Sequence, residues 1–518
     1  MVIVPNSKVK LIKNPLKLDS NNEMMFSNAT AQYNYFTSLP KLEFNNLTYI
    51  RKDDVLRIPT DETGVGVTYE KLLQYNFCMY QNTSFGNKWF YAFIDEVKWI
   101  NPSLTEVHLI TAYYQTWQFD LVLEDSFIER EHVNDDTTGL HTIPEGLETG
   151  PYVCNAYDDV TQLYTNLKIV MGSTAAPSGE GNFIGGVYNG IYSGVKYYTY
   201  SDSDTTLVIK SLADAGKADA LSSLFLAPEF IVPTSGGGPV TETASPIYIT
   251  KSINKQTTLD SYSPHNNKLK SSPYCYLLVT NGNGGSVTYN QELFTTAACG
   301  FTIMGSLTPG CSIRIIPNYY KNAFNAMGNF FDEGLNLGKY PQLNWATDMY
   351  TNWLTQTAIN TITDTAGGTL MGALTGGSAG ALIGGASTAL QGITNAIGQS
   401  FIADRIPPQT RGNTNCGDVV TGSHHNTFHF YSMSIKSEYA KVIDNYFDMF
   451  GYKVNRVGTP HLHARTYYDY IKTIEANIEG NIPEHDLVEI RKMFNNGIRF
   501  WHSTSNYLDF SVNNTIIS

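Results

Sequence analysis

The stretch at residues 88–125, "KWFYAFIDEVKWINPSLTEVHLITAYYQTWQFDLVLED", predicts two long β-strands joined by a tight turn. The turn lies at residues 101–103, "NPS", because proline fixes φ and Asn and Ser side chains bond to their own backbone. After the turn, both faces of the predicted strand are about half apolar. One face carries Val107, Leu109, Thr111 and Tyr113, and the other carries His108, Ile110 and Ala112. We expect one face to cover a core and the other to meet a neighbouring subunit.

Further strand patterns surround this pair. "LPKLEFNNLTYIRKD" (39–53) predicts two short strands around an Asn-Asn turn, and "SPIYITKSI" (245–253), "YCYLLVTNGNGGSVTYNQELF" (274–294) and "CSIRIIPNYY" (311–320) continue the pattern. The chain is rich in Tyr (34) and Gly (43), and only 16% of its residues are charged. This composition favours strands and turns over helical bundles. We predict a mainly β fold with some helices.

A few segments have helical spacing. These are "SLADAGKADALSSLFLAPEF" (211–230), "YKNAFNAMGNFFDEGLNL" (320–337), "SEYAKVIDNYFDMF" (437–450) and "PEHDLVEIRKMF" (483–494), with a strand "TFHFYSMSI" at 427–435. In "NWATDMYTNWLTQTAINTI" (344–362), Trp345, Met349 and Trp353 recur every fourth residue. Such an aromatic-anchored amphipathic helix suits a membrane interface or a protein surface.

These patterns divide the 518 residues into five parts. We expect a β-rich domain at 1–130, an irregular outer insertion at 131–240, a second β-rich domain at 241–342, a largely apolar loop at 343–425 and a C-terminal α+β part at 426–518. The N-terminus "MVIVPNSKVKLIKNP" has only four apolar residues before Pro5, too few for a secretory signal. The chain is therefore expected to be made in the cytosol and to stay there in soluble form.

The segment between Asp364 and Asp404 carries no charged side chain. It contains ten glycines, each costing about 1 kcal/mol in a water-exposed helix, so it is a weak candidate for a resident membrane span. Its small residues, however, lie four apart: Gly368, Gly372, Gly376, Gly380 and Gly384, continued by Thr388, Gly392, Ala396 and Ser400. Small residues at this spacing let helices approach closely in lipid.

Apolar side chains lie roughly opposite this small-residue ladder. The residues predicted to insert into a membrane or to pack inside an assembly are Gly368, Leu370, Gly372, Leu374, Gly376, Gly380, Leu382, Ile383, Gly384, Leu390, Ile393, Ile397 and Phe401, with Trp345, Met349 and Trp353 as interfacial anchors. Two interpretations remain open: a segment that enters a membrane conditionally, or a Gly/Ala hairpin that packs inside an assembly and never meets lipid.

No motif predicts catalysis, a cofactor or a metal. His424, His425 and His429 form an HHxxxH cluster, with His461 and His463 downstream, but a strand would place His425 and His429 about 13 Å apart. We therefore expect ordinary polar positions or a subunit contact. "GEGNFIGG" lacks a P-loop lysine, and the neighbouring carboxylates Asp135-Asp136 and Asp158-Asp159 are expected to point apart.

The cysteines and the charge balance restrict the class further. The six cysteines form no CxxC pair, so neither a disulfide framework nor a zinc ribbon is indicated. The net charge of −13 makes the chain a poor candidate for binding phosphate backbones. It suits a surface along which nucleic acid passes without being bound.

The order of these features resembles the distal tail-knob (tail-tube) proteins of small short-tailed bacteriophages that infect Gram-positive bacteria. The resemblance rests on "KLIKNPLKLDSNNEMMFSNATAQYNYFTSL" (10–39), the Gly/Ala apolar segment, "FHFYSMSIKSEYAKVIDNYFDMFGYKVNRV" (428–457) and "YIKTIEANIEGNIPEHDLVEIRKMFNNGIRFWH" (470–502). The last 90 or so residues carry the most specific part.

The resemblance implies a hexameric tube at the tail tip, built largely from β-barrel domains, through which phage DNA leaves without specific binding. The β-rich parts at 1–130 and 241–342 are then its tube domains. In each subunit, a long apolar loop plugs the exit and then enters the host membrane; here it matches roughly residues 343–425. The implied partners are five further copies, the lower collar or tail tube, tip and appendage proteins, and the host membrane. The alternatives are a purely structural or receptor-binding knob whose loop only stops the bore, an independent pore-forming toxin, and a cell-wall hydrolase.

Overall fold

The computed structural model describes most of the chain outside the uncharged segment. The described residues are 7–47, 49–50, 54–61, 66–83, 86–175, 182–184, 187–188, 191–192, 196–200, 211–212, 214–217, 220–232, 248–307, 311–321, 333–340, 342–344, 413–414 and 426–517. They form two compact units. The first unit comprises residues 1–148, 265–268 and 441–518, and the second comprises 149–264 and 269–440.

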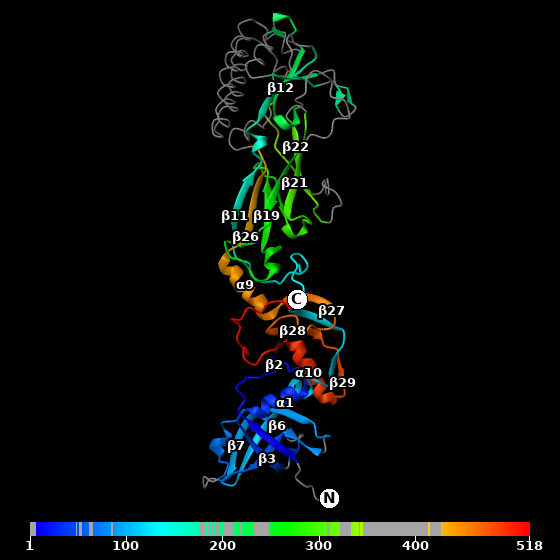
Figure 1. Cartoon of the computed structure of the whole chain (residues 1–518). Helices are drawn as coiled ribbons and strands as arrows, with labels where there is room; N and C mark the ends of the chain where they lie inside the picture. Colours follow the sequence, from blue (N-terminus) through cyan, green and yellow to red (C-terminus); the bar gives the residue numbers. More distant parts are fainter. Residues whose placement is uncertain are drawn as a thin grey trace. The chain divides into compact units, whose positions relative to one another are not determined.

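The largest sheet of the first unit has seven strands, in the order β3-β1-β6-β7-β8-β5-β4 (β3, β6 and β7 are labelled in Figure 1). Their bounds are β1 (Ser7–Ile12), β3 (Lys41–Leu47), β4 (Tyr49–Ile50), β5 (Val55–Pro59), β6 (Phe77–Gln81), β7 (Trp89–Asn101) and β8 (Leu104–Thr111). The antiparallel β7–β8 hairpin confirms the strand pair predicted around "NPS". Its turn is held by the Asn101 side chain, whose Oδ1 accepts the Ser103 amide at 2.9 Å.

A second sheet of the first unit has the order β2-β30-β28-β10-β27, and a two-stranded sheet pairs β29 with β9. Their bounds are β2 (Asn22–Met24), β9 (Leu121–Leu123), β10 (Ser126–Glu131), β27 (Tyr452–Gly458), β28 (Tyr468–Glu475), β29 (Ile478–Gly480) and β30 (Ile498–Trp501). The helices are α1 (Ala29–Ser38), α2 (Tyr69–Leu72), α3 (Tyr113–Trp117), α9 (Ser437–Phe450) and α10 (Glu484–Asn496), and α9 begins in the second unit. Both predicted C-terminal helices, α9 and α10, are confirmed.

The second unit holds three larger sheets. The first, β11-β26-β19-β20, contains β11 (Tyr152–Asp159), β19 (Cys275–Thr280), β20 (Ser286–Tyr289) and β26 (His429–Ile435). The second, β18-β21-β22-β23, contains β18 (Tyr248–Asn254), β21 (Ala298–Ser306), β22 (Ser312–Asn318) and β23 (Leu335–Asn336).

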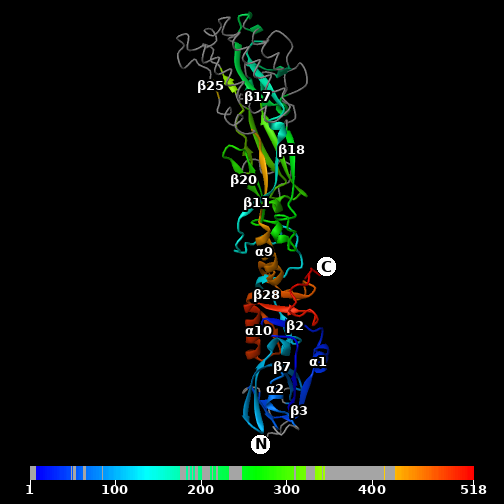
Figure 2. The same cartoon turned by 90° about the vertical axis from the view of Figure 1, so that its left-hand side faces the viewer.

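The third sheet of the second unit has the order β13-β16-β12-β17-β24-β25 (β17 and β25 are labelled in Figure 2). Its strands are β12 (Leu167–Ser173), β13 (Asn182–Ile184), β16 (Lys196–Tyr200), β17 (Leu221–Pro228), β24 (Gln342–Asn344) and β25 (Asn413–Thr414). A small hairpin pairs β14 (Val187–Tyr188) with β15 (Ile191–Tyr192), and short 3₁₀ helices are η3 (Thr161–Leu163), η5 (Glu229–Ile231), η6 (Asn267–Lys270) and η7 (Gln291–Leu293).

Three local predictions were wrong. Residues 221–228 form the buried strand β17 rather than the end of a helix, because a short apolar run does not distinguish a buried strand from a buried helix. The Asn45-Asn46 pair lies inside β3, where the positive φ of Asn46 (61°) accompanies a register shift in the pairing with β1 instead of a turn. The predicted strand beyond Thr111 turns into α3, whose Thr116 hydroxyl bonds the backbone of Tyr91.

The predicted helix at 320–337 falls largely outside the described residues, and its end forms β23 instead. The mainly β prediction is confirmed. Closed barrels are not seen within the described strands: the seven-stranded sheet has β3 and β4 at its two edges. Of the cysteines in the described part, Cys78, Cys275, Cys299 and Cys311 are buried and Cys154 is exposed, all with free thiols.

Candidate functional site

The predicted plug residues from Gly368 to Phe401 and the three interfacial anchors all lie outside the described residues. The structure does show where the chain enters and leaves this part. β24 and β25 pair antiparallel, with Leu343 opposite Thr414 and Asn344 opposite Asn413. Residues 345–412 therefore leave and return at two neighbouring strands of one sheet. We call this pair of strands the root of the uncharged segment.

The root is attached to the core of the second unit through β17, which lies between β12 and β24. Along β17, Ser223, Leu224 and Phe225 pair with residues 342–344. Phe225 is 2% exposed and belongs to the main apolar cluster of this unit. A buried strand next to the root gives it a fixed backbone partner, since each ladder hydrogen bond satisfies a buried polar group.

The chain on both sides of the root is held by buried hydrogen bonds. The Tyr340 hydroxyl, fully buried, donates to the Leu163 carbonyl at 2.6 Å. On the returning side, the Thr427 hydroxyl donates to the Val160 carbonyl at 2.9 Å and accepts the Val160 amide at 3.2 Å. Burial raises the pKa of the Tyr340 phenol well above its usual value, so it remains a neutral donor. Both flanks are thus fixed to the residues around η3.

A buried ionic cluster lies in the first unit. The Glu145 carboxylate is fully buried and makes ion pairs with Arg130 and Lys268, and it accepts the Lys453 amide at 3.0 Å. Burial lowers the pKa of Lys268, an effect that the neighbouring Glu145 opposes. Because buried charges are stable only when paired, this cluster fixes residues 265–268 against two other segments of the same unit.

The neighbouring carboxylates have separate partners. Burial raises the pKa of Asp136, whose carboxylate accepts the Asn267 amide at 2.8 Å and the Tyr452 hydroxyl at 2.6 Å. Asp158 pairs with Lys251 at 2.7 Å, whereas Asp159 accepts the Tyr164 hydroxyl at 3.2 Å. Each of these carboxylates thus stabilises its own part of the fold through a local hydrogen bond or ion pair.

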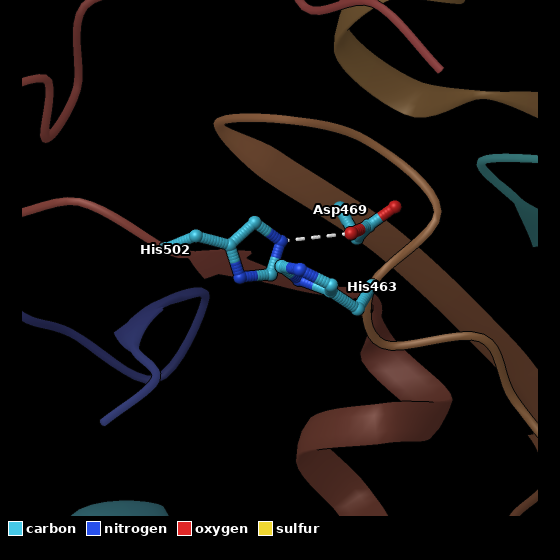
Figure 3. A group of neighbouring side chains, drawn as sticks. All are labelled: His463, Asp469 and His502. Atoms are coloured by element: carbon cyan, nitrogen blue, oxygen red, sulfur yellow. Dashed lines mark hydrogen bonds and ion pairs between the residues drawn. The ribbon is translucent and has the colours of Figure 1, made fainter. Parts of the chain in front are cut away.

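The histidines predicted from the HHxxxH pattern do not come together in the described part of the chain. His424 and His425 lie outside it, and His429 bonds the Tyr157 hydroxyl at 2.8 Å. His463 instead lies beside Asp469 and His502, as Figure 3 shows. No spacing signal links these three residues, since they come from the loop before β28, from β28 itself and from the loop after β30.

Among the described residues, no helix combines the length and apolar character that crossing a membrane requires.

Comparison with known proteins places these observations in a class. The sequence profile described as "Bacillus phage phi29, Tail knob protein gp9, C-terminal domain" matches residues 241–515, more than half of the chain. The profile "Caudoviral major tail protein N-terminus" matches residues 5–122. The chain is 26% identical to the tail knob protein gp9 of Bacillus phage phi29 over 97% of both sequences. It is 23% identical to the tail knob protein gp9 of Bacillus phage B103 over 100% of both.

A solved structure shares the fold over nearly the whole length. The tail knob protein gp12 of bacteriophage C1 superposes with a TM-score of 0.64, covering 99% of this chain and 100% of that one, at 16% identity. Fold and sequence together define a structural component of a bacteriophage tail, and hence of the virion. The chain belongs to the family of the tail knob protein gp9 of phage phi29. Membership implies assembly with other tail proteins.

Proposed function

We propose that six copies of this chain form a tube at the distal end of the tail, and that the uncharged segments first plug its exit and then enter the host membrane. Phage DNA then leaves through the lumen without specific binding. The chain is assembled in the host cytoplasm, contacts the lower collar or tail tube, the tip and appendage proteins, and acts without enzymatic activity. In this proposal residues 343–425 are the loop, and residues 1–130 and 241–342 supply the tube wall.

The observation that carries the proposal is the root of the uncharged segment. Asn344 and Asn413 are paired neighbours, so residues 345–412 are an excursion from one sheet edge and not a link between distant parts. An insertion between two paired strands can change its position while the strands at its ends remain paired. That property is required of a segment which occupies a bore before infection and lies elsewhere afterwards.

The open sheet of the first unit supports a tube made of several copies. Its edges, β3 and β4, close no barrel within the described residues, so a continuous wall requires neighbouring subunits. The second face of the hairpin also carries apolar side chains: Ile110 on β8 is 49% exposed and lies opposite Phe93 on β7. A net charge of −13 per chain gives a ring of six about −78, which favours passage of DNA over adhesion.

Vesicle leakage tests the membrane step. In the test variant, residues 345–412 are replaced by Asn-Gly, because a two-residue loop of this type closes an antiparallel pair such as Asn344 and Asn413. We expect the full chain to release dye from anionic vesicles once the segments are exposed, and the variant to release none while keeping its thermal unfolding midpoint. Equal leakage from both proteins would refute the membrane role.

A purely structural or receptor-binding knob is the second candidate. It predicts no leakage under any trigger and binding to cell-wall glycopolymer through residues 131–240. Particle images of the purified chain test the tube itself: a six-fold ring with density across the bore is expected, and that density should be missing in the Asn-Gly variant. Rings of another symmetry would refute the hexamer.

A further inference from the structure

His463, Asp469 and His502 are the one group of three His, Cys, Asp or Glu side chains in the described part of the chain whose ligand atoms converge closely. Their ligand atoms all lie within 4.8 Å of one another. The two imidazoles touch edge to face, with ring centroids 4.4 Å apart, and His502 Nε2 lies 2.8 Å from Asp469 Oδ2 (Figure 3). His463 is exposed, so a small solute has access to the group from solvent.

The carboxylate is held in place by backbone donors. Asp469 is fully buried, and its Oδ2 accepts the amides of Ala464 at 3.1 Å and Arg465 at 3.4 Å. These two residues directly follow His463, so the same carboxylate fixes the backbone that carries this imidazole. Backbone donors that orient a carboxylate are typical of the surroundings of metal ligands.

Within the described residues, the Asp469 carboxylate forms no ion pair with a lysine or arginine side chain. The basic side chains within 4.0 Å of it are both histidines: His502, and His132 at 3.9 Å from Oδ1. His132 Nδ1 accepts the Tyr470 amide at 3.0 Å and therefore carries no proton, so Nε2 donates to the Asp448 carbonyl at 3.1 Å and the ring is a neutral tautomer.

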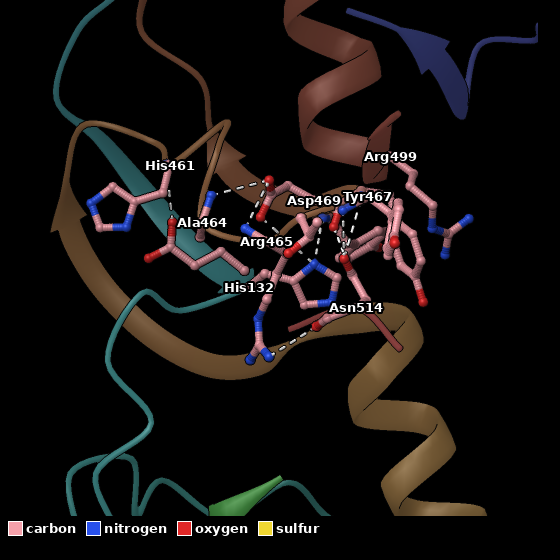
Figure 4. Close-up of polar contacts among 12 residues, drawn as sticks. His132, His461, Ala464, Arg465, Tyr467, Asp469, Arg499 and Asn514 are labelled. Carbon is pink, nitrogen blue, oxygen red and sulfur yellow. Dashed lines mark hydrogen bonds and ion pairs between the residues drawn. The ribbon is translucent and has the colours of Figure 1, made fainter. Parts of the chain in front are cut away.

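Two buried arginines of the same unit donate to other groups. The Arg465 side chain extends to the Asn514 carbonyl at 3.4 Å (Figure 4), and Arg499 donates to the Met449 carbonyl at 2.9 Å and to Asn22. Asp469 Oδ1 is also buried without a hydrogen-bond donor. A buried carboxylate in this state is stabilised by a cation next to it.

We propose that His463, Asp469 and His502 bind a divalent transition-metal ion, with Zn²⁺ as the best match. Two imidazole nitrogens and one carboxylate oxygen are ligands that Zn²⁺ prefers, and a tetrahedral ion with bonds of about 2.0–2.1 Å spaces its ligands roughly 3.3 Å apart. His502 and Asp469 are close to that spacing already, and rotation of the exposed His463 side chain completes the set. Water or a neighbouring subunit supplies the fourth ligand.

In this proposal the ion has a structural role: it cross-links the loop before β28 to the segment that follows β30. His502 is the first residue after β30, at the start of the C-terminal tail. This tail returns to the same loop, where Arg465 and Ile516 form an isolated bridge and the Asn514 side chain accepts the Tyr467 amide at 2.9 Å. Coordination by His463 and His502 would fasten both ends of the loop–tail contact. This inference is independent of the membrane role.

Zinc binding to the full chain, stripped with EDTA and desalted, tests the site by titration calorimetry and thermal unfolding. We expect one Zn²⁺ per chain and a higher unfolding midpoint with Zn²⁺ but not with Mg²⁺. His463→Ala, a change at an exposed side chain, should weaken binding about tenfold or more. His485→Ala is the control and should not, because His485 is also an exposed imidazole, with a 77% exposed side chain, but lies outside the group.

Asp469→Asn should abolish binding, but the loss of a buried carboxylate also affects folding, so His463→Ala is the deciding variant. Zn²⁺ binding of unchanged affinity in His463→Ala, or no binding by the wild-type chain, would overturn the proposal. The second result would mean that His502 and Asp469 form a hydrogen-bonded pair and nothing more.

Discussion

Asn344 and Asn413 face each other across β24 and β25, although residues 345–412 separate them in the chain. Residues 345–412 therefore begin and end on one sheet, whose inner strands β12 and β17 are largely buried. The fold on either side of the root can therefore be perturbed separately from the segment, and the two kinds of change have different expected outcomes.

Tyr340→Phe tests how firmly the root is attached. The change removes the hydroxyl that donates to the Leu163 carbonyl inside the core, with no loss of ring packing. An unpaired buried acceptor costs about 1–3 kcal/mol, and we expect the free energy of unfolding to fall by that amount in chemical denaturation. Tyr319→Phe, at a ring that is 38% exposed, is the control and should change stability by less than about 0.5 kcal/mol.

Glu145→Gln tests the buried ionic cluster. The variant leaves Arg130 and Lys268 buried together without their anion, and removing one partner of such a cluster costs about 3–5 kcal/mol. Denaturant unfolding of the first unit should show this loss. Glu484→Gln breaks an exposed pair with Arg491 and should have almost no effect; similar losses from both changes would contradict the assigned role of burial.

Glu23→Gln tests a buried acid. Burial raises the pKa of Glu23 to about 8. The hydrogen bond from Gln115 lowers this pKa, and the nearby charge of Asp19 raises it further. The folded chain thus holds this proton more tightly than the unfolded chain, whose carboxyl has a pKa near 4.5. The stability from protonated Glu23 is complete below pH 4.5 and is lost as the pH rises through about 8.

The Gln variant stays neutral at every pH. Its free energy of unfolding relative to wild type should therefore rise between pH 5 and pH 8.5, by an amount on the order of a few kcal/mol. A difference between the two proteins that does not vary with pH would show that Glu23 is ionised in the fold.

Gly376→Leu and Gly380→Leu test the small-residue ladder, on the basis of the proposed membrane role. Leucine on the small face keeps helices apart, so dye release from vesicles should fall at least about twofold. Ser378→Leu, off the ladder, is the matched control and should leave release unchanged. Equal effects at all three positions would mean that the small face is not a contact surface.

Local pattern predicted much of this fold. The "NPS" hairpin and α9 and α10 were readable because their signals, turn residues and helical periodicity, lie within a few residues of one another. β17 and α3 could not be predicted from local pattern, because burial in the tertiary structure determines their conformations. β17 is central in its sheet, and the Trp117 indole of α3 donates to Asp486 of α10 at 2.8 Å, far away in the sequence.

The sequence by itself determined the mainly β class, the family resemblance and the uncharged segment with its four-residue ladder, since these depend on composition and short-range spacing. Only the tertiary structure decided which distant residues meet. It brought Asn344 to Asn413, Glu145 to Lys268, and Asp469 to His463 and His502. Such contacts arise from the burial of whole sheets and from the pairing of buried charges, and neither effect produces a pattern among residues that are neighbours in the sequence.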